Sequence, residues 1–181
     1  MRGALAASMK PMSTTRAGRS IVVRTQSADE TRAAAAVFAR ALPPGATLSL
    51  EGPLGAGKTV FVRGFCEALG VTDIVTSPSY TLWNEYRTAD GRVVAHLDCF
   101  RLTSAGELED LGLEDRRDPA GFVLVEWGDR ALAALPADTV RVRLEPEPKG
   151  PETSRVLHVR LPDGVVLAGD LPESPGDEEL P

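Results

Sequence analysis

The sequence predicts an α/β protein with a central sheet and a C-terminal β-hairpin, and three observations support this prediction. A strand, a glycine-rich loop and a helix follow one another over residues 46–70. Residues 122–126 read FVLVE, an apolar run without alternation that is typical of a strand covered on both faces. Two alternating segments, 139–145 and 155–161, are joined by a proline-rich stretch and therefore indicate a hairpin.

The chain has the size and the apolar content of one ordinary domain, with 181 residues and 43% apolar composition. We expect this domain to span residues 21–164. Residues 1–20 are rich in arginine, alanine and serine and lack an apolar core of signal-peptide length, so we expect a flexible extension. Residues 165–181 are acidic and rich in proline, which predicts a disordered tail.

The net charge of −6 is unevenly distributed along the chain. Residues 1–28 carry five basic groups and no acid, and residues 161–181 carry six acids and no base. The segment between them has no basic cluster of the kind that nucleic-acid-binding proteins show, so contact with nucleic acid is expected to be indirect at most. No apolar run approaches the roughly 20 residues of a membrane helix. Cys66 and Cys99 are expected to be reduced thiols of a cytoplasmic protein without membrane contact.

The first helix is predicted to begin at Ser27, which has the S-x-x-E spacing of a capping box with Glu30. An alanine-rich amphipathic segment follows, and two prolines and a glycine at residues 43–45 end the helix. Residues 46–51 then alternate apolar and polar side chains, which indicates the strand that leads into the glycine-rich loop.

The loop reads EGPLGAGKTV and has the spacing G-x-x-x-x-G-K-T at Gly52, Gly57, Lys58 and Thr59. In such a loop the glycines let backbone N–H groups turn toward an anion, the lysine reaches the outer phosphates, and the threonine hydroxyl can ligate Mg²⁺. Residues 59–70 are predicted to form a helix, whose N-terminal dipole favours the same anion. The sequence therefore predicts a site for the phosphates of a nucleotide.

The middle of the chain is expected to form a loop and then a β-hairpin. A Ser-Pro break and the hydroxyls of Ser77 and Ser79 suit a loop that orders around a γ-phosphate and Mg²⁺, and turn capping explains these hydroxyls equally well. Segments 80–86 and 93–102 flank an Asp-Gly turn, which predicts an antiparallel pair of strands. A short helix is expected over residues 105–112.

Two acidic residues at predicted strand ends are candidates for the chemistry. Glu126 ends the strand at residues 122–126, where open α/β sheets bind ligands, although a strand-end acid beside a core tryptophan is the plain alternative. Asp98 lies on the same strand face as His96, and it is a candidate for the Mg²⁺ shell, directly or through water, or for a structural role. His96 is better explained as a hydrogen-bonded strand histidine than as a catalytic residue.

Five sequence motifs occur together in one order and spacing, namely GPLGAGKT, SPSYTL, HLDCFRL, ELEDLGLED and VEWGD. In this respect the chain resembles the TsaE (YjeE) family, the small bacterial ATPases of tRNA threonylcarbamoyladenosine synthesis. The resemblance spans roughly residues 27–161, and the joint set is far more specific than the phosphate loop alone. It implies a P-loop NTPase-type three-layer fold with a mixed central sheet, binding of ATP and Mg²⁺, and a weak, partner-controlled ATPase activity.

The resemblance also implies roles for individual residues and for partners. It implies Mg²⁺ ligation by Thr59 and Glu126, and an essential part in hydrolysis for Asp98 and Trp127. The implied partners are the threonylcarbamoyl transferase subunit and its inactive paralogue, with contact to tRNA at most indirect. The expected catalytic residues are Lys58, Asp98, Glu126 and Trp127, and the expected metal ligands are Thr59, Glu126 and Asp98. The expected nucleotide contacts are Gly52, Gly55, Ala56, Gly57, Lys58, Thr59, Val60, Ser77 and Ser79.

The chain departs from the family pattern at a few positions. Pro53 stands where an aspartate is usual, Ser79 replaces a threonine, and Cys99-Phe100 replaces an apolar-Tyr pair. Ser79 keeps a hydroxyl, so the expected switch chemistry is preserved, whereas Pro53 and Phe100 affect the expected local contacts.

The leading hypothesis is that ATP hydrolysis reorders residues 77–80 and thereby resets the transferase complex between turnovers. One alternative is a P-loop small-molecule kinase, which generally needs an arginine-rich lid, whereas this sequence offers only the scattered Arg116, Arg117 and Arg130. The other is a non-catalytic nucleotide-dependent interaction switch. Its guanine-specific form is disfavoured because the sequence contains no N-K-x-D segment.

Overall fold

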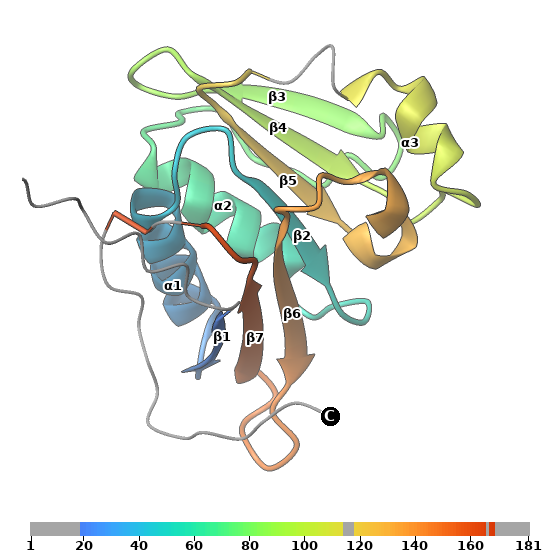
Figure 1. Cartoon of the computed structure of the whole chain (residues 1–181). Coiled ribbons are helices and arrows are strands. Elements are labelled where there is room, and N and C mark those ends of the chain that lie inside the picture. The colour runs from blue at the N-terminus through green and yellow to red at the C-terminus, as the bar shows by residue number, and fades with distance from the viewer. Residues whose placement is uncertain (1–18, 114–117, 166, 169–181) are drawn as a thin grey trace, which may run out of the picture.

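A seven-stranded mixed sheet with the order β1-β7-β6-β2-β5-β4-β3 forms the centre of the computed structural model (Figure 1). The structure describes residues 19–113, 118–165 and 167–168. The strands are β1 (Arg19–Thr25), β2 (Thr47–Glu51), β3 (Trp83–Arg87), β4 (Val93–Asp98), β5 (Phe122–Glu126), β6 (Val140–Pro146) and β7 (Arg155–Leu161). The helices are α1 (Ala28–Ala41), α2 (Lys58–Ala68) and α3 (Gly106–Asp110), with 3-10 segments η1 (Gly128–Arg130) and η2 (Leu132–Ala134).

The sheet is parallel at its centre and antiparallel at both sides. Strand β2 runs parallel to β5 and β6, and β5 runs parallel to β4. The pairs β3–β4, β6–β7 and β1–β7 are antiparallel. The α/β class, the mixed sheet and both predicted hairpins are therefore confirmed.

Helices α1 and α2 lie side by side on one face of the sheet (Figure 1). Ser27 caps α1 by accepting the Glu30 N–H at 3.2 Å, and Glu30 accepts the Gln26 N–H at 2.8 Å, so the predicted helix start is correct. The two helices approach closely at Gly64, where a Cβ atom would lie 2.4 Å from the Arg32 carbonyl oxygen. Glycine is therefore required at this crossing.

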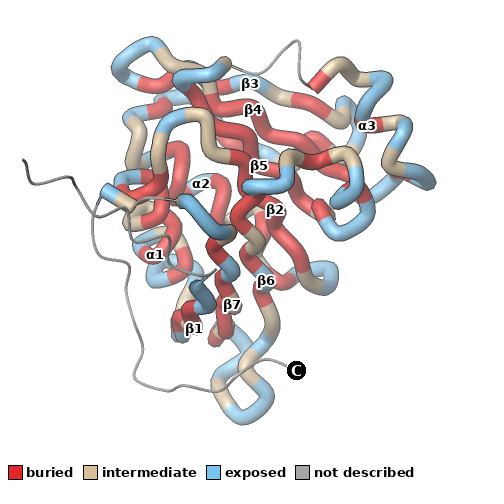
Figure 2. The backbone as a smooth tube through the Cα atoms, viewed as in Figure 1, coloured by how far each residue is buried: buried red, intermediate tan, exposed pale blue. Residues whose placement is uncertain are grey.

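Strand β5 is buried along its whole length (Figure 2), and apolar residues of two core clusters alternate along it, which explains its lack of apolar–polar alternation. Phe122 and Leu124 pack toward α1 and α2 in the larger core, with Phe38, Phe61 and Phe65 among its fully buried members. Val123 and Val125 face the other way, into a smaller core that includes Leu97, Leu108, Leu113 and Leu135. Helix α3 and the 3-10 segment η2 supply part of this second covering layer.

The register of the central strands brings three carboxyl ends together. Asp98, the last residue of β4, pairs with Glu126, the last residue of β5, and Glu126 pairs with Leu50 near the end of β2. The loop after β2 and the N-terminus of α2 lie at this same edge. The predicted phosphate loop and both predicted acids therefore share one end of the sheet.

Strand β1 was not expected from the sequence. It begins at Arg19, so Arg19 and Ser20 of the expected extension belong to the sheet, and the rest of that extension lies outside the described residues. Of the expected tail, the structure describes Val165, Leu167 and Ala168; the first two pack against the larger core. None of the helices in the described part is long and apolar enough to cross a membrane.

Candidate nucleotide-binding site

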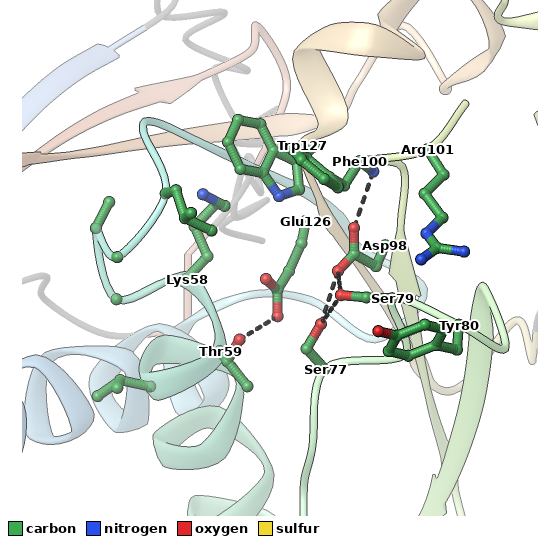
Figure 3. Close-up of a pocket in the computed structure, with 15 residues that line it drawn as sticks. Lys58, Thr59, Ser77, Ser79, Tyr80, Asp98, Phe100, Arg101, Glu126 and Trp127 are labelled. Atoms are coloured by element: carbon green, nitrogen blue, oxygen red, sulfur yellow. Dashed lines mark hydrogen bonds between the residues drawn. The ribbon is translucent and has the colours of Figure 1, made fainter. Parts of the chain in front are cut away.

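A pocket of about 570 Å³ opens at the carboxyl ends of the central strands (Figure 3). It contains all the predicted site residues except Gly52. The predicted residues that line it are Gly55, Ala56, Gly57, Lys58, Thr59, Val60, Ser77, Ser79, Asp98, Glu126 and Trp127. Four segments that are far apart in the sequence thus meet at one cavity.

The phosphate loop depends on glycine for two different reasons. Gly57 has φ 99° immediately before α2, a left-handed backbone conformation that residues other than glycine rarely adopt. Gly52 has φ 122°, and a Cβ atom there would lie 2.1 Å from the Leu144 carbonyl oxygen of β6. Gly52 allows the loop to pack against β6 and does not line the pocket, and its contact with the nucleotide stays a prediction.

Lys58 begins α2, and its ammonium group lies beside the loop backbone. Its Nζ donates to the carbonyl oxygens of Gly52 and Pro53, each at 2.8 Å, and lies 3.7 Å from the centre of the Trp127 ring. Burial lowers the pKa of Lys58, and the nearby carboxylates, first Glu126, oppose this shift. The loop thus holds a largely buried cation beside the pocket that an anionic ligand can use.

Glu126 connects the phosphate loop to the sheet through two hydrogen bonds. Its Oε1 accepts from the Thr59 hydroxyl at 2.7 Å (Figure 3) and lies 2.9 Å from His96 Nε2. His96 is fully buried, which agrees with the expected hydrogen-bonded strand histidine. Its role here is to hold the carboxylate whose oxygen meets Thr59.

The donor set fits Mg²⁺ on chemical grounds. A hydroxyl and a carboxylate oxygen, from Thr59 and Glu126, converge at the N-terminus of α2, and both are hard oxygen ligands. The described residues contain no group of three His, Cys, Asp or Glu side chains that could hold a metal ion. Mg²⁺ commonly binds through one or two protein ligands together with substrate phosphates, so this sparse set suits a shared metal.

Asp98 is tied to the Ser-Pro loop rather than to Thr59. Its Oδ2 accepts from the hydroxyls of Ser77 at 2.7 Å and Ser79 at 2.6 Å, and its Oδ1 accepts the Phe100 N–H at 2.8 Å (Figure 3). Asp98 is only 3% exposed. The structure therefore gives Asp98 the role of anchor for residues 77–79, and metal ligation by Asp98 stays a prediction.

Trp127 forms a wall of the pocket because the chain turns sharply there. It has φ 57°, and Leu82 is the other non-glycine residue with positive φ among those described. The turn lays the indole beside the Lys58 ammonium and within 5.0 Å of the Phe100 ring, measured between ring centres. A bulky residue in this conformation is unfavourable by itself, so packing must maintain it.

Four lining residues were not predicted as site residues: Leu54, Tyr80, Phe100 and Arg101. Leu54 and Tyr80 are 84% and 85% exposed, and the Arg101 guanidinium carbon lies 4.5 Å from the centre of the Tyr80 ring. An aromatic residue directly after the two candidate serines was the available signal for Tyr80. Arg116 and Arg117, considered for a kinase lid, lie outside the described residues.

The strand, glycine loop and helix, set in a mixed sheet with acids on the adjoining strands, define an α/β protein of the P-loop class. Its loop carries the lysine and the threonine of that class: Lys58 donates to a carbonyl oxygen of the loop itself, and Thr59 donates to Glu126. The chain belongs to the TsaE family, since residues 25–156 match the family described as threonylcarbamoyl adenosine biosynthesis protein TsaE.

Individual relatives agree with this assignment. The tRNA threonylcarbamoyladenosine biosynthesis protein TsaE of Bacillus subtilis is 42% identical over 120 residues, which cover 66% of this chain and 73% of the relative. The protein of the same name from Treponema pallidum is 36% identical, covering 66% and 87%. The crystal structure of Bacillus subtilis YdiB superimposes with a TM-score of 0.66 at 32% identity, covering 81% of this chain and 88% of that one.

Proposed function

We propose that this chain is a Mg²⁺-dependent cytoplasmic ATPase whose weak activity depends on partner proteins. Its family membership places it in tRNA threonylcarbamoyladenosine biosynthesis. The single observation that carries the ATPase proposal is the 2.7 Å hydrogen bond between Thr59 and Glu126, which joins the phosphate loop to a buried strand-end acid. A P-loop ATPase needs a hydroxyl and a carboxylate at this place to share Mg²⁺ with the phosphates.

In this proposal each group of the pocket has a separate task. The backbone from Gly55 to Thr59 and the Lys58 ammonium hold the phosphates. Thr59 and Glu126 would hold Mg²⁺, which would neutralise charge on the phosphate oxygens. Trp127 screens the lysine from water on one side, which strengthens its attraction for an anion.

The Ser-Pro loop supplies the change of shape. Ser77 and Ser79 both donate to one oxygen of Asp98, so either serine can turn to a phosphate oxygen only by giving up that bond. Asp98 Oδ2 then becomes free to accept a hydrogen bond from the attacking water. Hydrolysis reverses the exchange, and the loop returns to Asp98.

We further propose that this cycle resets the transferase complex between turnovers. The partners would be the threonylcarbamoyl transferase subunit and its inactive paralogue, with contact to tRNA at most indirect. Because resetting acts between rounds, removal of this chain should abolish multiple-turnover transfer and leave single-turnover transfer intact. Equal dependence of both on this chain would refute the resetting step while leaving the ATPase proposal standing.

The ATP site is tested by comparing Lys58→Ala with Lys149→Ala, an exposed lysine on the β6–β7 turn. Calorimetric titration with ATP and Mg²⁺ should show affinity lowered about a hundredfold or more for Lys58→Ala, because several kcal/mol of phosphate interaction are lost. Lys149→Ala should bind like the wild type. Wild-type protein that binds no ATP, or equal binding by both variants, would refute the assignment.

A further inference from the structure

The outer side of the phosphate loop is held by Arg155, the first residue of β7. Its Nε donates to the Ala56 carbonyl oxygen at 3.0 Å, and its Nη2 donates to the Gly55 carbonyl oxygen at 3.1 Å. Arg155 does not line the pocket as the structure describes it. It therefore contacts the loop from behind, a hundred residues away in sequence from the glycine that it holds.

These two bonds determine how the loop peptides face. In a planar trans peptide the N–H and the C=O point in opposite directions, and none of the described peptide bonds is cis. A donor on the Ala56 carbonyl thus turns the Gly57 N–H away from Arg155 and toward the pocket side. The peptide between Gly55 and Ala56 is held at both of its polar groups. Its carbonyl oxygen accepts from Arg155, and its N–H, that of Ala56, donates to the Pro53 carbonyl oxygen at 3.2 Å.

Without such a donor these peptides would have unusual freedom. Gly55 and Gly57 have φ 76° and 99°, and glycine adopts positive and negative φ with similar ease, so flips about these residues cost little. A flipped peptide would present a carbonyl oxygen to an anion in place of an N–H. The rigid fork of a guanidinium, which offers donors in one plane, suits two adjacent carbonyls better than an ammonium does.

The same guanidinium also reaches the turn between β6 and β7, residues 147–154. Its Nη1 donates to the Glu152 carbonyl at 2.6 Å and to the Ser154 carbonyl at 2.8 Å. Thr153, in the same turn, donates its hydroxyl to the Gln26 carbonyl at 2.7 Å. One planar group thus joins four carbonyl oxygens, two in the phosphate loop and two in the turn.

We propose that Arg155 is a positioning residue that presets the phosphate loop for anions and couples it to the β6–β7 turn. The inference rests on the proposed function, because the loop must bind nucleotide for the coupling to appear. Coupling between two sites is reciprocal, so a nucleotide on the loop must order the turn as much as an ordered turn favours the nucleotide. The turn thereby becomes a place from which a bound protein could tune nucleotide affinity.

The test compares Arg155→Ala and Arg155→Lys with Arg143→Ala, a β6 arginine whose guanidinium pairs at the surface with Glu145. We expect Arg155→Ala to weaken ATP binding about 10- to 100-fold, within the range of typical coupling energies, with Arg155→Lys between it and the wild type. Arg143→Ala should match the wild type. At saturating ATP, the Arg155 variants should hydrolyse ATP with nearly the wild-type kcat, because the substitution leaves the side chains proposed to take part in hydrolysis unchanged.

Amide hydrogen exchange separates positioning from a general loss of stability. ATP should slow exchange in residues 147–154 of the wild type and of Arg143→Ala, but not of Arg155→Ala. In nucleotide-free protein, exchange of the Ala56 amide should be faster in Arg155→Ala than in the wild type, with amides of the α1 core unchanged. Should Arg155→Ala fail to fold, Arg155→Lys carries the same comparison with the positive charge kept.

The outcomes distinguish this inference from the proposed function. The inference would be overturned if Arg155→Ala bound ATP with wild-type affinity, or if ATP did not change amide exchange in residues 147–154 of the wild type. Either result would leave the ATPase proposal standing. A wild type that binds no ATP overturns the proposed function and the coupling with it. If amide exchange at Ala56 were the same in nucleotide-free Arg155→Ala as in the wild type, Arg155 would not fix the loop peptides before a ligand binds. This result would count against the inference whatever the ligand is.

Discussion

The two halves of the pocket are built in different ways. The loop half is one continuous stretch, residues 52–58, most of which line the pocket, and the neighbouring strands β6 and β7 hold its outside. The acid half consists of side chains from separate segments that hydrogen-bond to one another, namely Thr59 with Glu126 and the two serines with Asp98. A ligand can enter the loop half while the hydrogen bonds of the acid half stay in place. For the acid half to contact a ligand, its side chains must give up some of the hydrogen bonds that they make to one another. Affinity should therefore depend on the loop half, and catalysis and change of shape on the acid half.

Glu126→Gln should produce the largest effect on turnover, because it removes the charge of the proposed metal ligand while keeping its shape. We expect hydrolysis in the presence of the partners to fall roughly 100- to 1000-fold, about 3–4 kcal/mol in the barrier. Measurement of the rate against Mg²⁺ concentration should show that the metal requirement is changed. Glu145→Gln, at a partly exposed position of β6, is the control. If Glu126→Gln hydrolysed ATP at the normal rate and with normal Mg²⁺ dependence, catalysis would not depend on the acid half and the proposed difference between the two halves would be wrong.

Asp98→Asn should have a smaller effect, because Asp98 anchors a loop in the structure and does not contact Thr59. We expect the rate to fall about 100-fold, at the lower end of what one positioned acid or base contributes, with ATP affinity changed little. Exchange of the amides in residues 77–80 should become faster, since the serines lose a charged acceptor. If Asp98→Asn altered the Mg²⁺ requirement as strongly as Glu126→Gln, Asp98 would be a direct ligand and the division within the acid half would be wrong.

The smallest effect concerns two buried thiols, one in the last turn of α2 and one directly after Asp98. Burial raises the pKa of Cys66 in α2 and of Cys99 after Asp98 to about 12, from an ordinary value of 9.0. Both should remain protonated at pH 8 and react with iodoacetamide far more slowly in the native than in the unfolded protein. Because the folded state keeps these protons longer, they lower stability only as pH rises from about 9 toward 12.

Single-cysteine variants, Cys66→Ala and Cys99→Ala, would show whether the acid half opens during turnover. Cys99 should become more reactive during ATP turnover, since its neighbour Asp98 exchanges its partners, and Cys66 should stay protected. Mass spectrometry of the labelled protein measures this directly. Faster labelling of Cys66 instead would place the movement in the packing of α2 and not in the acid half.

The sequence anticipated most of the regular elements because their signals are local. The capping spacing of Ser27 and Glu30 and the turn between β3 and β4 involve only a few neighbouring residues. Strand β1 was not predicted because it lies at the edge of the sheet and pairs with one strand alone. Its pairing partner, β7, lies more than a hundred residues away, so only long-range pairing makes it a strand.

The phosphate loop was determined by the sequence itself, since eight consecutive residues contain the glycines, the lysine and the threonine that an anion site needs. Only the tertiary structure decided that Glu126 meets Thr59, that Asp98 holds the two serines, and that Arg155 stands behind the loop. These contacts join residues 67, 21 and 99 positions apart. Strand register and packing set such distances, and no local spacing encodes them.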